Sequence, residues 1–177
     1  MKIKTFSTER LKISKLRLIE IEKIRELHNE PSTLKWLSDS KPVTPIKQLR
    51  WFCRLSKSKN QVRLVAREKM NNEIIGIFRL DNIDLENAVA QVGLDIAENY
   101  RGKGYGQEFF LKVIDYCFMH LAMNRLELIT LKNNFAAVSL YKKLGFKEEG
   151  IKREYLNKNG NYQDVIIFSI LRKEFQK

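Results

Sequence analysis

Cysteine, proline and glycine are all scarce in this sequence. Its 177 residues include 2 Cys, 3 Pro and 8 Gly. The two cysteines, Cys53 and Cys117, cannot form a disulfide framework, and they lie in two separate apolar segments. The low Pro and Gly content excludes a collagen-like or Pro-rich segment. These absences favour a globular protein kept in a reducing compartment, and we expect it in the cytoplasm.

Long hydrophobic runs are absent as well. The most apolar stretch, residues 109–123, is interrupted by Lys112, Asp115 and His120. A membrane-spanning helix needs about 20 apolar residues in a row, and no apolar segment of a secretion signal follows the positively charged start. We therefore expect neither a membrane span nor a targeting segment. Histidine is also rare, and His28 and His120 do not stand at metal-ligand spacing with the cysteines, so no metal site is expected.

Positive charge is abundant and unevenly distributed. Hydrophobic residues make up 44% of the chain and charged residues 31%, which is typical of one globular domain spanning residues 1–177. The formal net charge is +12. Residues 1–60 contain 15 Lys and Arg against 6 Asp and Glu. The first third of the chain is therefore the most basic part.

Within that part, four basic residues follow steps of three and four: Lys47, Arg50, Arg54 and Lys57. On a helix this spacing places them on one face, while Trp51, Phe52 and Leu55 point toward the core. Such a face attracts an anionic partner: a nucleotide, a ribosomal RNA surface or cofactor phosphates. A solvated helix face without a partner is the simpler alternative, because most charge runs are of that kind.

Hydrophobic periodicity predicts a chain of alternating strands and helices. The expected strands are 11–13, 62–66, 74–80, 89–97, 126–130 and 165–170, and the expected helices are 18–27, 46–56, 107–123 and 134–144. The strands between residues 62 and 97 are joined by short turns, which is typical of antiparallel pairing. The order predicts an α+β fold, an α/β sandwich around a mixed sheet.

The segment between residues 97 and 107 carries the clearest chemical signal. A strand enters a loop and leaves as a helix, and glycines occupy alternate positions of that loop: Gly102, Gly104 and Gly106. Backbone N–H groups of such a loop and of the first helical turn converge on anionic oxygens, and Arg101 and Lys103 add cationic side chains. The spacing fits neither the ATP-binding P-loop nor the dinucleotide fingerprint. The alternative is a strand-to-helix turn that binds nothing.

Two motifs resemble those of the GNAT acetyltransferases. Residues 101–106, Arg-Gly-Lys-Gly-Tyr-Gly, resemble the family's Arg/Gln-x-x-Gly-x-Gly/Ala signature. Residues 134–146, from Asn134 to Phe146, resemble its Asn-x-x-Ala-x-x-Leu-Tyr-x-Lys-x-Gly-Phe motif. Residues 7–11 and 152–165 also resemble the RimJ/RimL-like subgroup, which acetylates ribosomal-protein N-termini, and its polyamine and amino-sugar relatives. The resemblance implies a mixed, mostly antiparallel sheet with a splayed central pair, flanked by helices, and acetyl transfer from acetyl-CoA.

The resemblance also assigns roles to individual residues. The backbone of Leu94, Asp95 and Ile96 would pair with the pantetheine arm and the thioester carbonyl, and Asn134 would contact the cofactor near its pantetheine end. The pyrophosphate would be held by the loop residues Arg101, Gly102, Lys103, Gly104, Tyr105, Gly106 and Gln107. Tyr141 would place its hydroxyl near the thioester sulfur and protonate the departing thiolate. An aromatic side chain packed in the core is the alternative for Tyr141.

The general base is not identified by the sequence. Two positions at which relatives carry a proton acceptor are occupied here by Gln91 and Ile129, and neither can accept a proton. A water relay is one alternative. The other candidates are Asp81, Asp84, Glu86, Glu30, His28 and Asp95.

Several acceptors remain open. A protein N-terminus of the ribosomal type or an amino-sugar nucleotide suits a basic protein, whereas the net charge of +12 disfavours a polyamine. A function from another class is an RNA- or ribosome-binding module that keeps the fold without catalysis, because Gln91 replaces a carboxylate and the first third is basic. A second copy of the chain, forming a homodimer, is a further candidate partner.

Overall fold

The computed structural model describes residues 3–39 and 41–175, which form one eight-stranded sheet with helices on both faces. The strands are β1 (Phe6–Ser7), β2 (Leu11–Lys15), β3 (Val62–Glu68), β4 (Ile74–Asp84), β5 (Val89–Ile96), β6 (Arg125–Leu131), β7 (Lys147–Lys158) and β8 (Asn161–Leu171). The α-helices are α1 (Ile21–Asn29), α2 (Pro31–Leu34), α3 (Pro45–Lys57), α4 (Tyr105–His120) and α5 (Phe135–Lys143). Short 3-10 turns lie at Leu18–Glu20, Glu98–Tyr100 and Arg172–Glu174.

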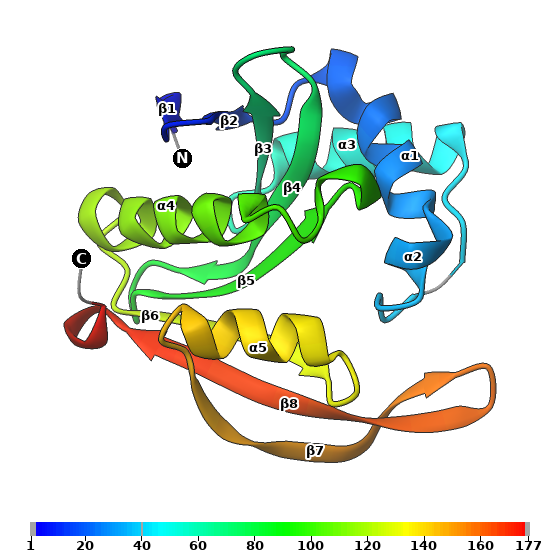
Figure 1. The fold of residues 1–177 in the computed structure, drawn as a ribbon, viewed down its shortest axis with the longest axis vertical. Coiled ribbons are helices and arrows are strands. Elements are labelled where there is room, and N and C mark those ends of the chain that lie inside the picture. The colour runs from blue at the N-terminus through cyan, green and yellow to red at the C-terminus, as the bar shows by residue number, and fades with distance from the viewer. Residues whose placement is uncertain (1–2, 40, 176–177) are drawn as a thin grey trace.

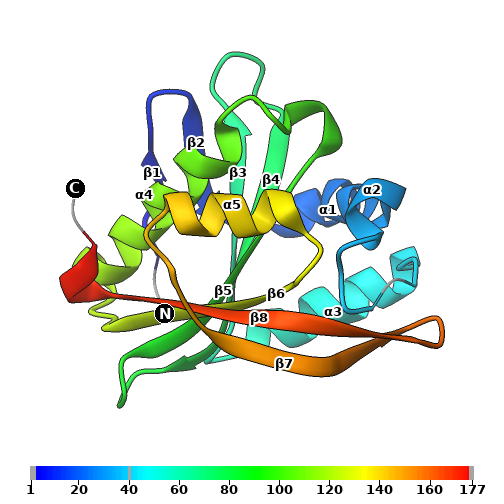
Figure 2. The same cartoon turned by 60° about the horizontal axis from the view of Figure 1, so that its bottom comes forward.

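The sheet is mostly antiparallel, in the order β1-β2-β3-β4-β5-β6-β8-β7. The exception is the central pair, in which β5 and β6 run parallel and are paired only from Val89 to Gln91 on β5 and from Arg125 to Glu127 on β6. Beyond Gln91 and Glu127 the two strands diverge (Figure 2). The predicted fold class, including the splayed central pair, is confirmed.

Helices cover the two faces unequally (Figure 1). On one face, α4 and α5 pack on the large core cluster, which includes Phe78, Phe109 and Phe168. On the other face, α1 and α3 cover a smaller cluster around Val65 and Ile77. The part of that second face formed by β5, β6, β7 and β8 is open to a cavity.

Helix α3 is the predicted basic helix. Thr44 caps it by accepting a hydrogen bond from the Lys47 N–H at 3.4 Å, and Pro45 stands at its first position. The four basic side chains, Lys47, Arg50, Arg54 and Lys57, are all exposed, while Leu55 is buried in the smaller cluster with Trp51 and Phe52 against it. The predicted division of this helix into a basic face and a packed face is confirmed.

Several elements differ from the sequence-based expectation, among them α4, α2 and β7. The long helix α4 begins at Tyr105 because Gly104 caps it in a left-handed conformation. Pro31 ends α1 as expected, but it also starts the short helix α2. Strand β7 was not expected, because its side chains are almost all exposed or half-buried and show no apolar alternation. Among the described residues, no helix is long and apolar enough to cross a membrane.

Candidate active site

The divergence of β5 and β6 leaves one edge of β5 available for a ligand. The Ala97 N–H donates to the Ile75 carbonyl of β4 at 2.9 Å. Because backbone groups alternate between the two sides of an antiparallel strand, Leu94 and Ile96 direct theirs away from β4, into the gap. The Arg101 Nε donates to the Ile96 carbonyl at 2.8 Å, so the backbone groups of Leu94 and the N–H of Ile96 are the part of this edge that stays available.

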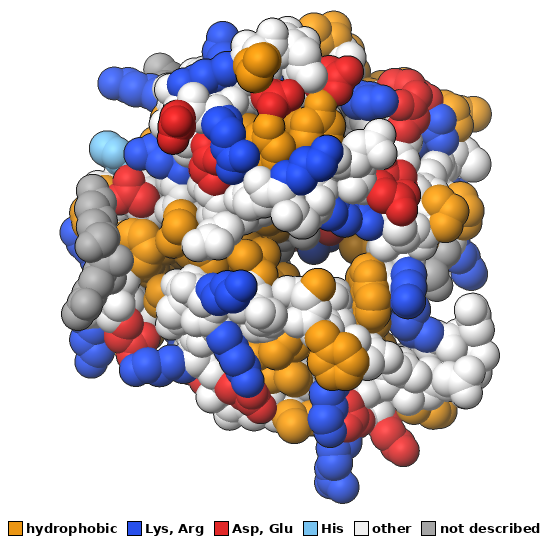
Figure 3. Space-filling model, viewed as in Figure 1, with side chains coloured by type: hydrophobic (Ala, Val, Ile, Leu, Met, Phe, Trp, Pro, Cys, Tyr) orange, Lys and Arg blue, Asp and Glu red, His pale blue; other side chains and the backbone are white. Residues whose placement is uncertain are grey.

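A cavity of about 220 Å³ lies at this gap. Six of the residues that the sequence singled out line it: Leu94, Asp95, Ile96, Arg101, Asn134 and Tyr141. Asp95 directs its backbone toward β4 instead of the gap, so its contribution to the cavity is its side chain. Figure 3 shows the surface hollowed between the half of the molecule that carries α4 and the half that carries α5.

Tyr141 lies on α5 at the boundary between the core and this cavity. Its ring packs against Phe110, Phe146 and Phe168, with centroid separations of 5.7, 6.0 and 5.9 Å. Its hydroxyl has no hydrogen-bond partner within the described chain, and burial raises the pKa of the phenol to about 12. The phenol therefore stays protonated at neutral pH and can donate into the cavity. The two interpretations of Tyr141 are compatible, because the ring packs in the core while the residue also lines the cavity.

Asn134 positions the start of α5. Its side-chain oxygen accepts a hydrogen bond from the Ala137 N–H at 3.3 Å, which caps the helix. The side-chain amide remains as a donor at the wall of the cavity.

The glycine loop has the backbone conformation that its sequence requires. Gly102 and Gly104 have φ angles of 73° and 82°, in the left-handed region. A Cβ atom on Gly102 would meet no heavy atom within 4 Å, so the outer side of the loop is open. The N–H groups of the first turn of α4 lack partners within the helix. Together they form a site to which a phosphate group can come close.

The side chains of this loop are used mainly for structure. The Arg101 guanidinium donates to Glu30 Oε2 at 3.1 Å and to Thr33 Oγ1 at 2.6 Å. Tyr105 is buried, and its hydroxyl donates to Glu68. Lys103 and Gln107 are exposed. If this loop binds a phosphate group, the contacts would thus come from the loop backbone and from the Lys103 side chain.

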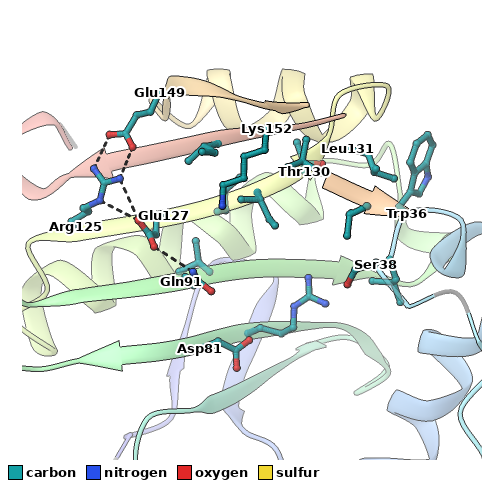
Figure 4. Close-up of a pocket in the computed structure, with 18 residues that line it drawn as sticks. Trp36, Ser38, Asp81, Gln91, Arg125, Glu127, Thr130, Leu131, Glu149 and Lys152 are labelled. Carbon is teal, nitrogen blue, oxygen red and sulfur yellow. Dashed lines mark hydrogen bonds and ion pairs between the residues drawn. The ribbon is translucent and has the colours of Figure 1, made fainter. Parts of the chain in front are cut away.

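A second cavity, of about 610 Å³, lies on the other face of the sheet (Figure 4). It is lined by side chains of β4 to β8 and by residues 36–38. The two cavities adjoin, since they share five lining residues: Trp36, Leu37, Arg79, Ile129 and Thr130. Gln91 and Ile129, the two positions without a proton acceptor, both line it.

The carboxylates of this second cavity are paired with arginines. Asp81 pairs with Arg63 at 2.8 Å, and Glu127 pairs with Arg125 at 3.3 Å. Glu149 accepts from Arg125 Nη1 at 2.7 Å and from the Ser169 hydroxyl at 2.6 Å. These donors lower the pKa of Glu149 to about 2.

Arg79 lies where the two cavities meet. A Cβ atom on Gly93 would stand 2.6 Å from Arg79 Nη2, so the guanidinium rests directly on the β5 backbone. Arg79 Nη1 also pairs with Asp95 Oδ2 at 3.2 Å. No local motif points to Arg79, because its position depends on the β4–β5 register, in which it faces Gly93.

The candidates for the general base differ in whether their side chains are available to accept a proton. Asp81, Glu30 and Asp95 are each ion-paired with an arginine. Two further candidates are away from the gap: Asp84 is the last residue of β4, and Glu86 lies in the turn that follows.

His28, at the end of α1, is the remaining side-chain candidate. It makes no hydrogen bond within the described chain. Burial lowers its pKa, with Arg79 acting in the same direction and Asp95 opposing it. The imidazole is therefore neutral at neutral pH and able to accept a proton.

Known proteins with similar sequences identify the family of this chain. The model of the acetyltransferase (GNAT) domain family matches residues 10–147. The chain is 31% identical to the uncharacterized N-acetyltransferase p20 of Bacillus licheniformis, over 98% of this chain and 99% of that protein. It is 28% identical to a spermidine N(1)-acetyltransferase of Vibrio cholerae, over 90% of this chain and 94% of that protein.

A solved structure extends the comparison to the fold. The crystal structure of spermidine N-acetyltransferase from Vibrio cholerae, in complex with CoA and spermine, superposes with a TM-score of 0.87. The identity is 26%, and the match covers 94% of this chain and 98% of that one. These findings favour an enzyme over the non-catalytic RNA-binding alternative. The chain belongs to the GNAT acetyltransferase family and is an acetyl-CoA-dependent N-acetyltransferase.

Proposed function

We propose that this enzyme binds acetyl-CoA and a primary amine together and that the amine attacks directly, with Tyr141 as the acid. One observation carries the proposal: Tyr141, whose hydroxyl has no partner within the described chain, lines the same cavity as the available edge of β5. Neither cysteine offers a covalent route. Cys117 is buried and its pKa is raised to about 12, and Cys53 is exposed on α3, outside the residues that line the cavity.

Acetyl-CoA would be held along the gap. Leu94 and Ile96 would contribute backbone groups beside the pantetheine arm, with the Asp95 and Asn134 side chains next to them. The pyrophosphate would lie on the glycine loop and the first turn of α4, at Arg101, Gly102, Lys103, Gly104, Tyr105, Gly106 and Gln107. The cosubstrate supplies an acetyl thioester. A backbone N–H on the β5 edge would stabilise the negative charge on the carbonyl oxygen, and Tyr141 would donate its proton to the sulfur.

The proton of the amine has two possible acceptors. His28 is neutral and free of hydrogen bonds within the described chain, whereas the carboxylates that line the two cavities are ion-paired. The alternative is a water relay through the second cavity. Replacing His28 by Ala distinguishes them: a base role predicts a loss of turnover that rises in severity as the pH falls, and a water relay predicts no such change.

The acceptor is an amine that enters through the second cavity. A protein N-terminus of the ribosomal type, as in the RimJ/RimL-like subgroup, or an amino-sugar nucleotide suits the basic protein. The similarity to spermidine acetyltransferases supports a polyamine as the second candidate.

A free-thiol release assay with acetyl-CoA tests the proposal. The acceptor panel contains N-terminal peptides of ribosomal proteins, amino-sugar nucleotides, amino acids and spermidine. We expect thiol release with one acceptor class, and calorimetry should show acetyl-CoA binding in its absence. Acetyl-CoA binding without thiol release for any amine would contradict the proposal for this panel, and absence of acetyl-CoA binding would contradict the placement of the cofactor.

A further inference from the structure

Lys158 ties the β7–β8 hairpin to the end of α2. It is the last residue of β7. Its ammonium group donates to three backbone carbonyls: those of Lys35 at 2.6 Å, Leu37 at 2.8 Å and Leu34 at 3.5 Å. An ammonium group has three N–H donors, so this side chain uses all of them on the α2 side. In Figure 1 the turn between β7 and β8 lies on the same side of the molecule as α2.

The end of α2 is a place where such a contact matters. The helix has four residues, Pro31–Leu34, and so short a helix is not stable by itself. Carbonyl groups at a helix C-terminus carry partial negative charge, which a cation stabilises. At the other end of this segment, Arg101 donates to the Thr33 hydroxyl at 2.6 Å. The segment is therefore held from the cofactor loop on one side and from the hairpin on the other.

Trp36 and Leu37 stand where the two cavities meet. Both residues line the cavity at the gap and the second cavity. Two of the carbonyls that Lys158 holds belong to the residues on either side of Trp36. Figure 4 shows the Trp36 side chain at one end of the second cavity. An acceptor that passes from the second cavity to Tyr141 therefore meets this part of the wall.

Lys158 itself lines neither cavity. It can therefore act on the acceptor only through the segment that it holds. Loss of the ammonium group would remove three hydrogen bonds at once and would free Trp36 and Leu37 to move. A displacement of about 1 Å, even one caused far from the reacting atoms, can lower turnover about 100-fold.

We propose that Lys158 is a positioning residue for the acceptor: it fixes Trp36 and Leu37 as the wall shared by the two cavities. The proposal rests on the acetyl transfer proposed above and on entry of the acceptor through the second cavity. Its contribution is to the placement of the amine, because the glycine loop and the β5 edge, where acetyl-CoA is proposed to lie, do not contact Lys158.

The first test follows the position of Trp36 and does not depend on activity. The chain has two tryptophans, Trp36 and Trp51, so Trp51→Phe leaves Trp36 as the only indole. Acrylamide quenching of its fluorescence is measured with and without the further change Lys158→Met, which keeps the length of the side chain and removes its donors. We expect a larger quenching constant in Lys158→Met, because a released segment exposes the indole to the quencher more often.

The second test is kinetic and uses the amine of the free-thiol panel that has the highest kcat/KM with wild type. Lys158→Met should lower kcat/KM for this amine on the order of tenfold. The Kd of acetyl-CoA, measured by calorimetry, should not change. A loss of stability alone would not separate the two substrates in this way.

Lys147→Met is the matched control. Lys147 stands at the other end of β7, donates to Glu174 at 2.6 Å and lines neither cavity, so its replacement should alter neither the quenching of Trp36 nor the acceptor kinetics. Unchanged quenching or unchanged kcat/KM in Lys158→Met, or equal effects of the two changes, would overturn this inference and leave acetyl transfer intact. If wild type releases no thiol with any amine, the proposed function itself fails, and the positioning role fails with it.

Discussion

At the scale of single residues, Tyr141 serves both the core and the site. Replacing it by Phe keeps the ring contacts with Phe110, Phe146 and Phe168 and removes the donor. We expect kcat to fall about 100-fold, within the usual range for loss of a general acid, while the affinity for acetyl-CoA stays within about twofold. Steady-state kinetics and calorimetry measure the two quantities.

An equal loss of affinity and turnover in that variant would make Tyr141 a binding residue instead. The pH dependence gives an independent check. Because the phenol has a pKa of about 12 in the folded protein, its ionisation should produce no decline in kcat of the wild-type enzyme up to about pH 10. A decline near pH 8 that disappears in Tyr141→Phe would contradict the assignment.

Gly104 and Gly160 form a matched pair of left-handed glycines, with φ angles of 82° and 86°. Val at either position costs about 1–2 kcal/mol of backbone strain, but only Gly104 lies in the loop before α4. We expect Gly104→Val to abolish binding of acetyl-CoA in calorimetry, and Gly160→Val to keep it. Retained affinity in Gly104→Val would show that the loop does not bind the pyrophosphate.

Glu149 makes part of the stability pH-dependent. Its pKa is lowered in the folded state from 4.5 to about 2 by Arg125 and Ser169, so folding favours the ionised form. This contribution is fully present above about pH 4.5 and is lost as the pH falls toward 2. Urea denaturation should therefore show Glu149→Gln less stable than wild type at pH 7, with a smaller difference at pH 3. A difference that does not change with pH would contradict this explanation.

At the scale of elements, Arg101 ties the α1–α2 junction to the end of β5. It bonds Glu30 and Thr33 on one side and the Ile96 carbonyl on the other. Arg101→Ala should lower the free energy of unfolding by about 1–3 kcal/mol, measured by urea denaturation. Arg54→Ala, an exposed change on α3, is the control and should alter it by less than about 0.5 kcal/mol. Similar effects of the two changes would mean that Arg101 does not hold this junction.

The sequence predicts buried strands and helices better than exposed ones, because only burial imposes an apolar pattern on the side chains. Strands such as β3 and β8 have strong apolar patterns and were expected at nearly their observed positions. Strand β7 forms one edge of the sheet and is held by its pairing with β8, and its exposed side chains carry no apolar signal. The short helix α2 was missed because a proline at the start of a helix looks the same as one that ends the preceding helix.

The residues of the site also differ in how well the sequence alone predicts them. Local motifs predict roles for the glycine loop, Asn134 and Tyr141, which stay predictions, and the structure brings residues of the β5 end and of α5 to one cavity. The second cavity could not be found in this way, because Arg79, Glu127 and Lys152 meet only through the register of separate strands. The pairing of its carboxylates with arginines likewise depends on contacts between distant residues.

At the scale of the whole molecule, the net charge of +12 is most evident on α3. We predict that this face binds polyanions, and that Gln at Lys47, Arg50, Arg54 and Lys57 weakens RNA binding and reduces its salt dependence. Filter binding at several salt concentrations measures this, and kcat with a small acceptor is the control that should not change. RNA binding that is absent in wild type, or equal in the variant, would identify α3 as a solvated face. A homodimer stays a prediction that sedimentation can test.

The short contact between β5 and β6 has a mechanical consequence. Three residue pairs join these strands, fewer than join any other neighbouring strands except β1 and β2, so the centre of the sheet is held together least where acetyl-CoA is proposed to lie. Acetyl-CoA bound in the gap would contact both β5 and β6 and would hold the two strands together. Binding of acetyl-CoA would then reduce the motion between the two halves of the sheet, and release of CoA would restore that motion. The rate at which the gap between β5 and β6 loosens to release CoA would therefore help to set how quickly the enzyme can start its next turnover.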